Sequence, residues 1–136
     1  MMSANNTYRG VVAAVALCTL TQCFTERQSE GQQLYAQQCA SCHMDDGSGL
    51  RGLIPPLAGS DYLTRHRGEL ACLIRNGQQG EIEVNGVRYN RPMPGVPDLS
   101  EVHITNILNY IQTSFGNSNE PFTVQEVNSS LQTCRP

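Results

Sequence analysis

The residues of this chain best suited to do chemistry lie in one short run, Cys39-Ala40-Ser41-Cys42-His43. Two thiols at this spacing can each add to one vinyl group of the same haem, and a histidine directly after the second thiol then lies under the iron as an axial ligand. The run therefore predicts one covalently attached haem c, bound through Cys39 and Cys42 and ligated by His43 as its proximal iron ligand.

Two other chemistries use a Cys-x-x-Cys pair, and the rest of the chain favours neither. A redox dithiol of the thioredoxin kind needs a strand–helix–strand context, and no such pattern precedes Cys39. A zinc site needs a second pair of ligands at short spacing, whereas Cys72 and Cys134 stand alone. Haem attachment remains the interpretation that the run favours.

A second axial ligand is expected on the other face of the haem, and four side chains are candidates for it. Met44 adjoins His43 and cannot reach the opposite face. His66 lies between two arginines, which is typical of a surface position, and His103 lies beside the apolar stripe of a predicted helix. Met93 stands between two prolines, which forbid a regular helix and stiffen the loop. We predict Met93 as the distal iron ligand.

Length and composition indicate one ordinary globular domain. The chain has 136 residues, of which 15% are charged and 39% hydrophobic, unlike a disordered protein. The formal net charge of −3 gives no reason to expect nucleic acid as a partner. All nine basic residues are arginines, so a positive docking patch would consist of arginine alone. Arg51, Arg88 and Arg91 are candidates for such a patch, for pairs with haem propionates, or for plain solvated surface.

Residues 1–22 resemble an export signal. Arg9 supplies the positive start, and the apolar stretch 11–20 is too short to span a bilayer as a helix. Leu20-Thr21-Gln22-Cys23 resembles the cleavage box of bacterial lipoproteins, but Gln22 stands where that box prefers a small residue. Two outcomes stay open: an exported, periplasmic protein without an anchor, or a lipoprotein held at the membrane through Cys23, with residues 23–29 as a linker.

Helical spacing of apolar residues and capping signals predict helices in the rest of the chain. Ser29 and Ser60 are the expected N-caps of the first two helices, and Gly68 breaks or weakens the second. Asp98-Leu99-Ser100-Glu101 is a capping box that opens the third. The predicted helices cover residues 30–38, 61–75, from this box to about 115, and 124–131.

Residues 81–90 carry a different signal. Asn85-Gly86 lies between β-branched residues, which is the strongest short signal for a β-hairpin. The hairpin leads directly into the loop that carries Met93. Tyr89, near its end, is therefore a further candidate to contact the cofactor.

Taken in order, these motifs resemble those of the class I cytochromes c over about residues 30–115. The most specific match is the haem-attachment run, and Met93 in Met93-Pro94-Gly95 is similar to the sixth ligand of the family. The weaker matches are Gly31 with Tyr35, Asp46-Gly47-Ser48-Gly49, Pro55-Pro56-Leu57-Ala58-Gly59, and Ile107 with Tyr110.

The resemblance implies an all-α class I cytochrome c fold, in which three to five helices surround the haem and the hairpin is an insertion. The first and last helices of a domain over 30–116 would cross near Gly31 and Tyr110, and a side chain at Gly31 would block their approach. Pro55 and Pro56 would lie beside the haem, and the carbonyl of one of them would accept a hydrogen bond from the haem histidine.

Residues 117–136 would form a C-terminal tail packed on this domain. Cys72 and Cys134 remain once the haem motif and the signal segment are counted. Because an exported protein meets an oxidising compartment, these two can form a disulfide that ties the tail to the middle helix. Two unpaired buried thiols are the alternative.

The predicted function is electron transfer rather than catalysis. A His/Met pair leaves no open position on the iron for oxygen or peroxide, whereas a haem enzyme or gas sensor needs one. The expected partners are a redox donor and acceptor, such as a dehydrogenase, a reductase or a terminal oxidase. A dedicated subunit of one such enzyme is the remaining alternative, with the hairpin as a recognition element or as a lid over the haem edge.

Overall fold

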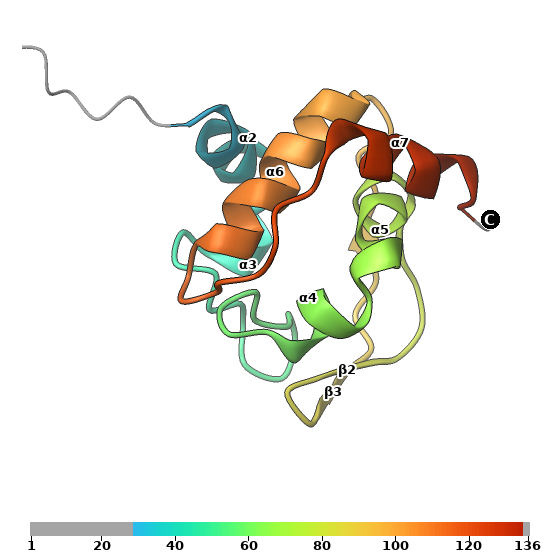
Figure 1. Ribbon diagram of the computed structural model, residues 1–136. Helices are drawn as coiled ribbons and strands as arrows, with labels where there is room; N and C mark the ends of the chain where they lie inside the picture. The colour runs from blue at the N-terminus through green and yellow to red at the C-terminus, as the bar shows by residue number, and fades with distance from the viewer. Residues whose placement is uncertain (1–28, 135–136) are drawn as a thin grey trace, which may run out of the picture.

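The structure is a computed structural model that describes residues 29–134 (Figure 1). The predicted signal segment, the linker up to residue 28 and Cys23 lie outside this range. No helix in the described range is both long and apolar enough to cross a membrane. The described α-helices are α2 (Glu30–Gln38), α3 (Ala40–His43), α4 (Asp61–Arg65), α5 (Leu70–Asn76), α6 (Glu101–Thr113) and α7 (Val124–Gln132). The predicted all-α architecture with a small hairpin is confirmed.

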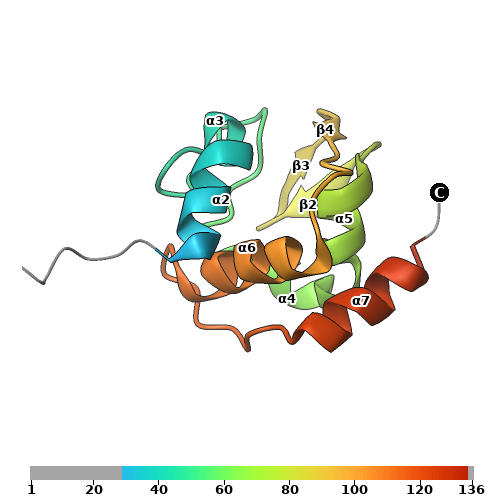
Figure 2. The same cartoon turned by 90° about the horizontal axis from the view of Figure 1, so that it is seen from above.

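Helices α2 and α6 cross and pack against each other (Figure 2). Ser29 caps α2, as predicted, by accepting a hydrogen bond from the backbone N–H of Gln32. The crossing is close because Gly31 has no side chain, and a Cβ atom there would lie 3.0 Å from the Cβ atom of Tyr110. The rings of Tyr35 and Tyr110 pack beside the crossing, with centroids 5.4 Å apart.

One apolar stripe of α6 supplies the middle of the core. Ile104 and Ile107 are fully buried, and Leu108 and Ile111 are almost so. The start of this helix differs from the prediction: Ser100, not Asp98, is the N-cap, and its hydroxyl accepts from the backbone N–H of His103. The predicted capping box is therefore wrong by two positions, because the turn before the helix extends through Leu99, which is buried.

The stretch predicted as one helix over 61–75 is divided in three. α4 ends at Arg65, the short 3-10 helix η2 (Arg67–Glu69) follows, and α5 begins at Leu70. Gly68 lies inside η2, so the predicted weak point is confirmed. Ser60 holds the N-cap position of α4 but makes no capping hydrogen bond with its side chain.

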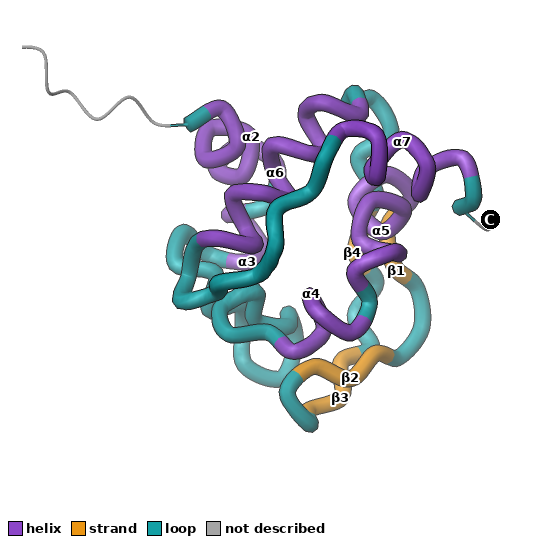
Figure 3. Tube along the Cα trace, viewed as in Figure 1, coloured by secondary structure: helices purple, strands orange, loops and turns teal. Residues whose placement is uncertain are grey.

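Two small antiparallel sheets follow α5 (Figure 3). β2 (Ile82–Val84) and β3 (Val87–Tyr89) form the predicted hairpin, whose turn residues Asn85 and Gly86 both have positive φ angles, 52° and 75°. The second sheet was not predicted: β1 (Gly77–Gln78) pairs with β4 (Met93–Pro94), and Gln78 lies opposite Met93.

The C-terminal tail returns along the domain and places α7 against α5 (Figure 1). The Arg67 guanidinium lies 3.7 Å from the ring centroid of Phe122 and donates hydrogen bonds to the carbonyl oxygens of Glu120 and Pro121. The disulfide Cys72–Cys134 joins α5 to the chain just beyond α7, with 5.5 Å between the Cα atoms. The tail is thus held at both ends.

Candidate functional site

Segments far apart in the sequence enclose one apolar cavity of about 320 Å³. α3 and residues 54–57 line it from one part of the chain, and the hairpin and β4 from another. Leu108 and Ile111 of α6 also line it. Every cofactor-contacting residue predicted from the sequence lines this cavity: Cys39, Cys42, His43, Pro55, Pro56, Tyr89 and Met93.

The attachment run forms the single turn of α3, directly after α2. The backbone N–H of His43 donates to the Cys39 carbonyl, so the turn brings the imidazole and both thiols to the same cavity. The Tyr35 hydroxyl donates to the Met44 carbonyl over 2.6 Å and holds the chain where it leaves this turn. Burial is the main reason that the pKa of Tyr35 is raised, so the hydroxyl stays protonated as a donor.

His43 is buried, with 8% of its surface exposed, and its Nδ1 lies 3.1 Å from the Pro55 carbonyl oxygen. A carbonyl can only accept, so Nδ1 carries the proton and Nε2 keeps the lone pair that a metal ligand needs. Burial lowers the pKa of His43, against the opposing effect of the Pro55 hydrogen bond, and so favours the neutral, ligating imidazole.

Pro55 is brought to His43 by a tight loop. The backbone N–H of Gly49 donates to the His43 carbonyl, and Leu50 and Ile54 form a short antiparallel bridge. Gly49 has a φ of 66°, and a Cβ atom on it would lie 2.6 Å from the Pro55 carbonyl oxygen. Only glycine fits here without moving the acceptor of the His43 hydrogen bond.

Of the four side chains weighed as distal ligands, only Met93 lines the cavity. Two of the others have acidic neighbours instead: Nδ1 of His66 lies 3.2 Å from Glu69, and Nε2 of His103 lies 3.8 Å from Glu30. Met93 is held in place by its β-pairing with Gln78.

The surroundings of the thiols disagree with the two alternative chemistries. Burial, and then the neighbouring Cys42, raise the pKa of Cys39 to about 11, whereas the cysteines of redox dithiols have lowered pKa values. Within the described part of the chain, no cluster of three or more His, Cys, Asp or Glu side chains is arranged to hold a metal ion.

The cavity lining suits a flat apolar ring with carboxylates at its edge. Its exposed surface is mostly apolar, but Ser60, Tyr62, Gln78, Tyr89 and Arg91 also line it. The hydroxyls of Ser60, Tyr62 and Tyr89 make no hydrogen bond with another residue of the described range, which leaves donors for the two propionates of a haem. The donor set and the lining therefore fit haem c.

The three arginines considered from the sequence have different surroundings. Arg91 lines the cavity, whereas Arg88 lies on the exposed side of the hairpin, 3.6 Å from Glu81. Arg51 is exposed in the loop after α3. Only Arg91 is thus placed where it can meet a cofactor.

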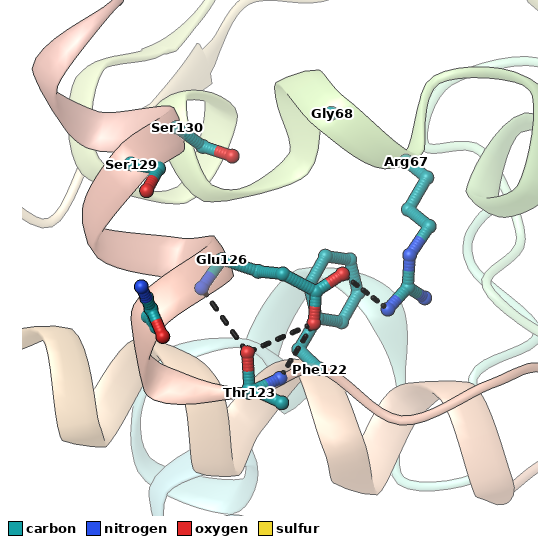
Figure 4. A pocket seen from close by; sticks show the side chains of 8 residues that line it. Arg67, Gly68, Phe122, Thr123, Glu126, Ser129 and Ser130 are labelled. Atoms are coloured by element: carbon teal, nitrogen blue, oxygen red, sulfur yellow. Dashed lines mark hydrogen bonds and ion pairs between the residues drawn. The ribbon is translucent and has the colours of Figure 1, made fainter.

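A second hollow, between η2 and α7, is open and lined by residues that already bind one another (Figure 4). Arg67 donates to Glu126 over 3.3 Å, and the Glu126 carboxylate also accepts hydrogen bonds from the backbone and hydroxyl of Thr123. Its polar groups serve the docking of α7, so we do not assign a ligand to it.

The family model described as cytochrome c matches residues 28–115, which contain the attachment run and Met93. The chain belongs to the cytochrome c family. Members of this family bind a covalent c-type haem and carry electrons, so haem attachment and electron transfer hold for this cytochrome c.

Several relatives resemble this cytochrome c. Two sequences of cytochrome c-552 from Thermus thermophilus are 38% identical over 109 residues, which cover 74% of this chain and 82% and 73% of the relatives. The cytochrome c subunit of alcohol dehydrogenase (quinone) from Gluconobacter oxydans is 34% identical over 97 residues, 69% of this chain but only 20% of that subunit.

Sequence reasoning missed several residues that shape the site of this cytochrome c. Gln78 was not predicted because a two-residue strand has no detectable alternation. Ser60 and Tyr62 were considered only as parts of a helix. Polarity among apolar neighbours was the one signal available, and it does not reveal which face a side chain occupies.

Proposed function

We propose that this cytochrome c is an exported electron carrier with one haem, ligated by His43 and Met93. One observation carries the proposal: the two side chains come from distant parts of the sequence, yet both line the same apolar cavity as Cys39 and Cys42. A soft thioether and an imidazole in such a cavity are a ligand pair for reversible one-electron transfer.

Each part of the site has a separate task. Haem c, when bound, supplies the Fe(II)/Fe(III) couple, and methionine ligation raises its potential. Cys39 and Cys42 hold the ring covalently, and the Pro55 carbonyl fixes the tautomer and orientation of His43. The apolar lining excludes water, which disfavours the more highly charged oxidised site.

Replacing Met93 tests the distal ligand. In Met93→Ala we expect loss of the near-infrared sulfur-to-iron band of the oxidised protein, a lower reduction potential and new binding of carbon monoxide by the reduced protein. Met44→Ala is the matched control, because Met44 does not line the cavity, and it should keep the band. An unchanged band and potential in Met93→Ala would refute this ligand.

Export and the redox partners also belong to this proposal. The signal-like residues 1–22 and the pair Cys72–Cys134 both suit an oxidising compartment such as the periplasm, where a donor and an acceptor would meet the haem. A membrane anchor would require lipid on Cys23. Cell fractionation of the unaltered protein and of Cys23→Ser, with mass measurement of the mature N-terminus, separates a lipoprotein from an unanchored product.

A second candidate function is service as the electron-transfer part of one dehydrogenase. It is favoured by the relatives named as cytochrome c subunits of alcohol dehydrogenase (quinone). Purification of the native protein decides between a free electron carrier and a dedicated subunit. A free carrier elutes alone, whereas a dedicated subunit elutes with a dehydrogenase activity.

A further inference from the structure

The hairpin covers the haem cavity with one of its faces. Ile82, Val84 and Tyr89 line the cavity, and Val84 and Tyr89 are only 2% and 8% exposed. Glu83 and Arg88, which lie opposite each other across the two strands, are exposed on the hairpin's outer side. A hairpin of two three-residue strands is not stable by itself, so contacts elsewhere must keep it in this position.

The base of the segment that contains the hairpin is closed by the β1–β4 pairing. Gln78 and Met93 lie opposite each other, so the chain between them leaves and returns at one point. Only residues 90–92 separate the hairpin from Met93. A hairpin that swings away from the cavity therefore pulls directly on the methionine.

The tip of the hairpin is tied to α4 by a reciprocal pair of hydrogen bonds. The backbone N–H of Asp61 donates to the side-chain oxygen of Asn85 over 3.0 Å, and the backbone N–H of Asn85 donates to the Asp61 carboxylate over 2.8 Å. Arg65 adds hydrogen bonds to the Asp61 carboxylate and to the Glu83 carbonyl. Neither Asp61 nor Asn85 lines the cavity.

We propose that the Asp61–Asn85 pair is a latch that keeps the hairpin closed over the haem and thereby keeps Met93 on the iron. The proposal rests on the function proposed above and assigns Asp61 and Asn85 as positioning residues, which act through the hairpin. Opening the latch exposes the apolar face of the hairpin and gives external ligands access to the iron.

Hydrogen bonds at an exposed site contribute little to global stability, but they govern how often a small segment opens. Each bond is worth about 1 kcal/mol, so losing both should raise the open population of the hairpin about tenfold or more. The rest of the fold is held together by the packing of α2, α6 and the tail. Its opening rate should therefore not change when the latch is removed.

The test compares four single variants and the double variant Asp61→Ala/Asn85→Gly, all in the full haem-loaded protein. Asp61→Ala removes the acceptor of the Asn85 N–H, whereas Asp61→Asn keeps an oxygen there and should restore the latch. Asn85→Gly removes the other acceptor but suits the positive φ of the turn, so the hairpin itself is retained. Glu83→Ala is the matched control, because its carboxylate makes no hydrogen bond or ion pair with another described residue.

Two readouts are needed: amide hydrogen exchange over residues 82–93, and the rate at which the reduced protein binds carbon monoxide. In Asp61→Ala and Asn85→Gly, each of which removes one of the two bonds, we expect both readouts to rise about fivefold, with α6 exchange unchanged, and in the double variant we expect them to rise about tenfold or more. For Asp61→Asn we expect both rates to be close to those of the unaltered protein. For Glu83→Ala we expect both rates to equal those of the unaltered protein.

Unchanged hairpin exchange in Asp61→Ala would overturn the latch. Equal acceleration in α6 would overturn it as well, because it would indicate global rather than local opening. If the unaltered oxidised protein has no sulfur-to-iron band, Met93 ligation fails separately, and hairpin exchange alone then decides whether the latch exists.

Discussion

Gly31 lies against the backbone of Asn106, so closely that a Cβ atom on Gly31 would come within 2.2 Å of the Asn106 carbonyl oxygen. The glycine therefore sets the distance between α2 and α6. Because α3 follows directly on α2, the same distance sets where the haem-attachment turn lies relative to α6. Helix α6 in turn lines the cavity with Leu108 and Ile111.

Gly31→Ala should destabilise the protein although alanine favours helices. The added methyl group meets backbone rather than a flexible side chain, and overpacking of this kind costs about 1–3 kcal/mol, more than the helical gain of about 1 kcal/mol. Denaturant unfolding measures the difference. Gly68→Ala is the control, since nothing lies within 4 Å of a Cβ atom there, and it should be neutral or slightly stabilising.

Removing the Cys72–Cys134 disulfide should loosen the tail without affecting haem attachment. Because it closes a loop with a sequence separation of 62, the chain-entropy model gives about 4 kcal/mol as its contribution. We expect Cys72→Ser/Cys134→Ser to unfold at lower denaturant concentration while still binding haem covalently. Intact mass without reductant should show the native pair two hydrogens short; labelling of both thiols would contradict the disulfide.

Arg67→Lys should weaken the tail nearly as much as Arg67→Ala, by about 1–3 kcal/mol. Arginine donates to two carbonyl oxygens and stacks on Phe122, and lysine keeps the charge but not this planar fork. Thermal unfolding and exchange in α7 measure the effect. Arg88→Lys, at an exposed pair 3.6 Å from Glu81, should change little. An Arg67→Lys variant that unfolds at the same temperature as the unaltered protein would contradict this and assign the contact to charge alone.

Glu126 should make the docking of α7 sensitive to acid. Hydrogen bonds from Thr123, and then Arg67, hold the pKa of this exposed carboxyl below its ordinary value of 4.5. Since the folded pKa is below the unfolded one, the stabilisation is fully present above about pH 4.5 and is lost as the pH falls through the folded pKa.

The melting temperatures of the unaltered protein and Glu126→Gln should therefore differ most near neutral pH and converge in acid. Glu120→Gln provides a comparison, because the Glu120 side chain makes no hydrogen bond or ion pair within the described range. A difference in melting temperature that stays constant as the pH falls would contradict a role for the ionised Glu126 in docking α7.

The structural features predicted most accurately were those that depend on a few neighbouring residues. Ser29 caps its helix, Asn85-Gly86 turns its hairpin, and Cys39 to His43 carry the attachment motif, because each depends on local backbone geometry or local chemistry. The start of α6 was misplaced, since Asp98 and Ser100 are equally good caps and only the burial of Leu99 separates them.

The sequence by itself thus determined the cofactor and the helical class, and it predicted the two attachment cysteines and the proximal histidine. Only the tertiary structure decided that Pro55 rather than Pro56 accepts from His43, that Gln78 pairs with Met93, and that the hairpin tip meets α4. These contacts join residues distant in the chain, and their partners depend on how whole elements pack. The spacing and composition of the sequence do not specify these long-range contacts, because the free energy that favours them comes from burial of many residues across the whole fold.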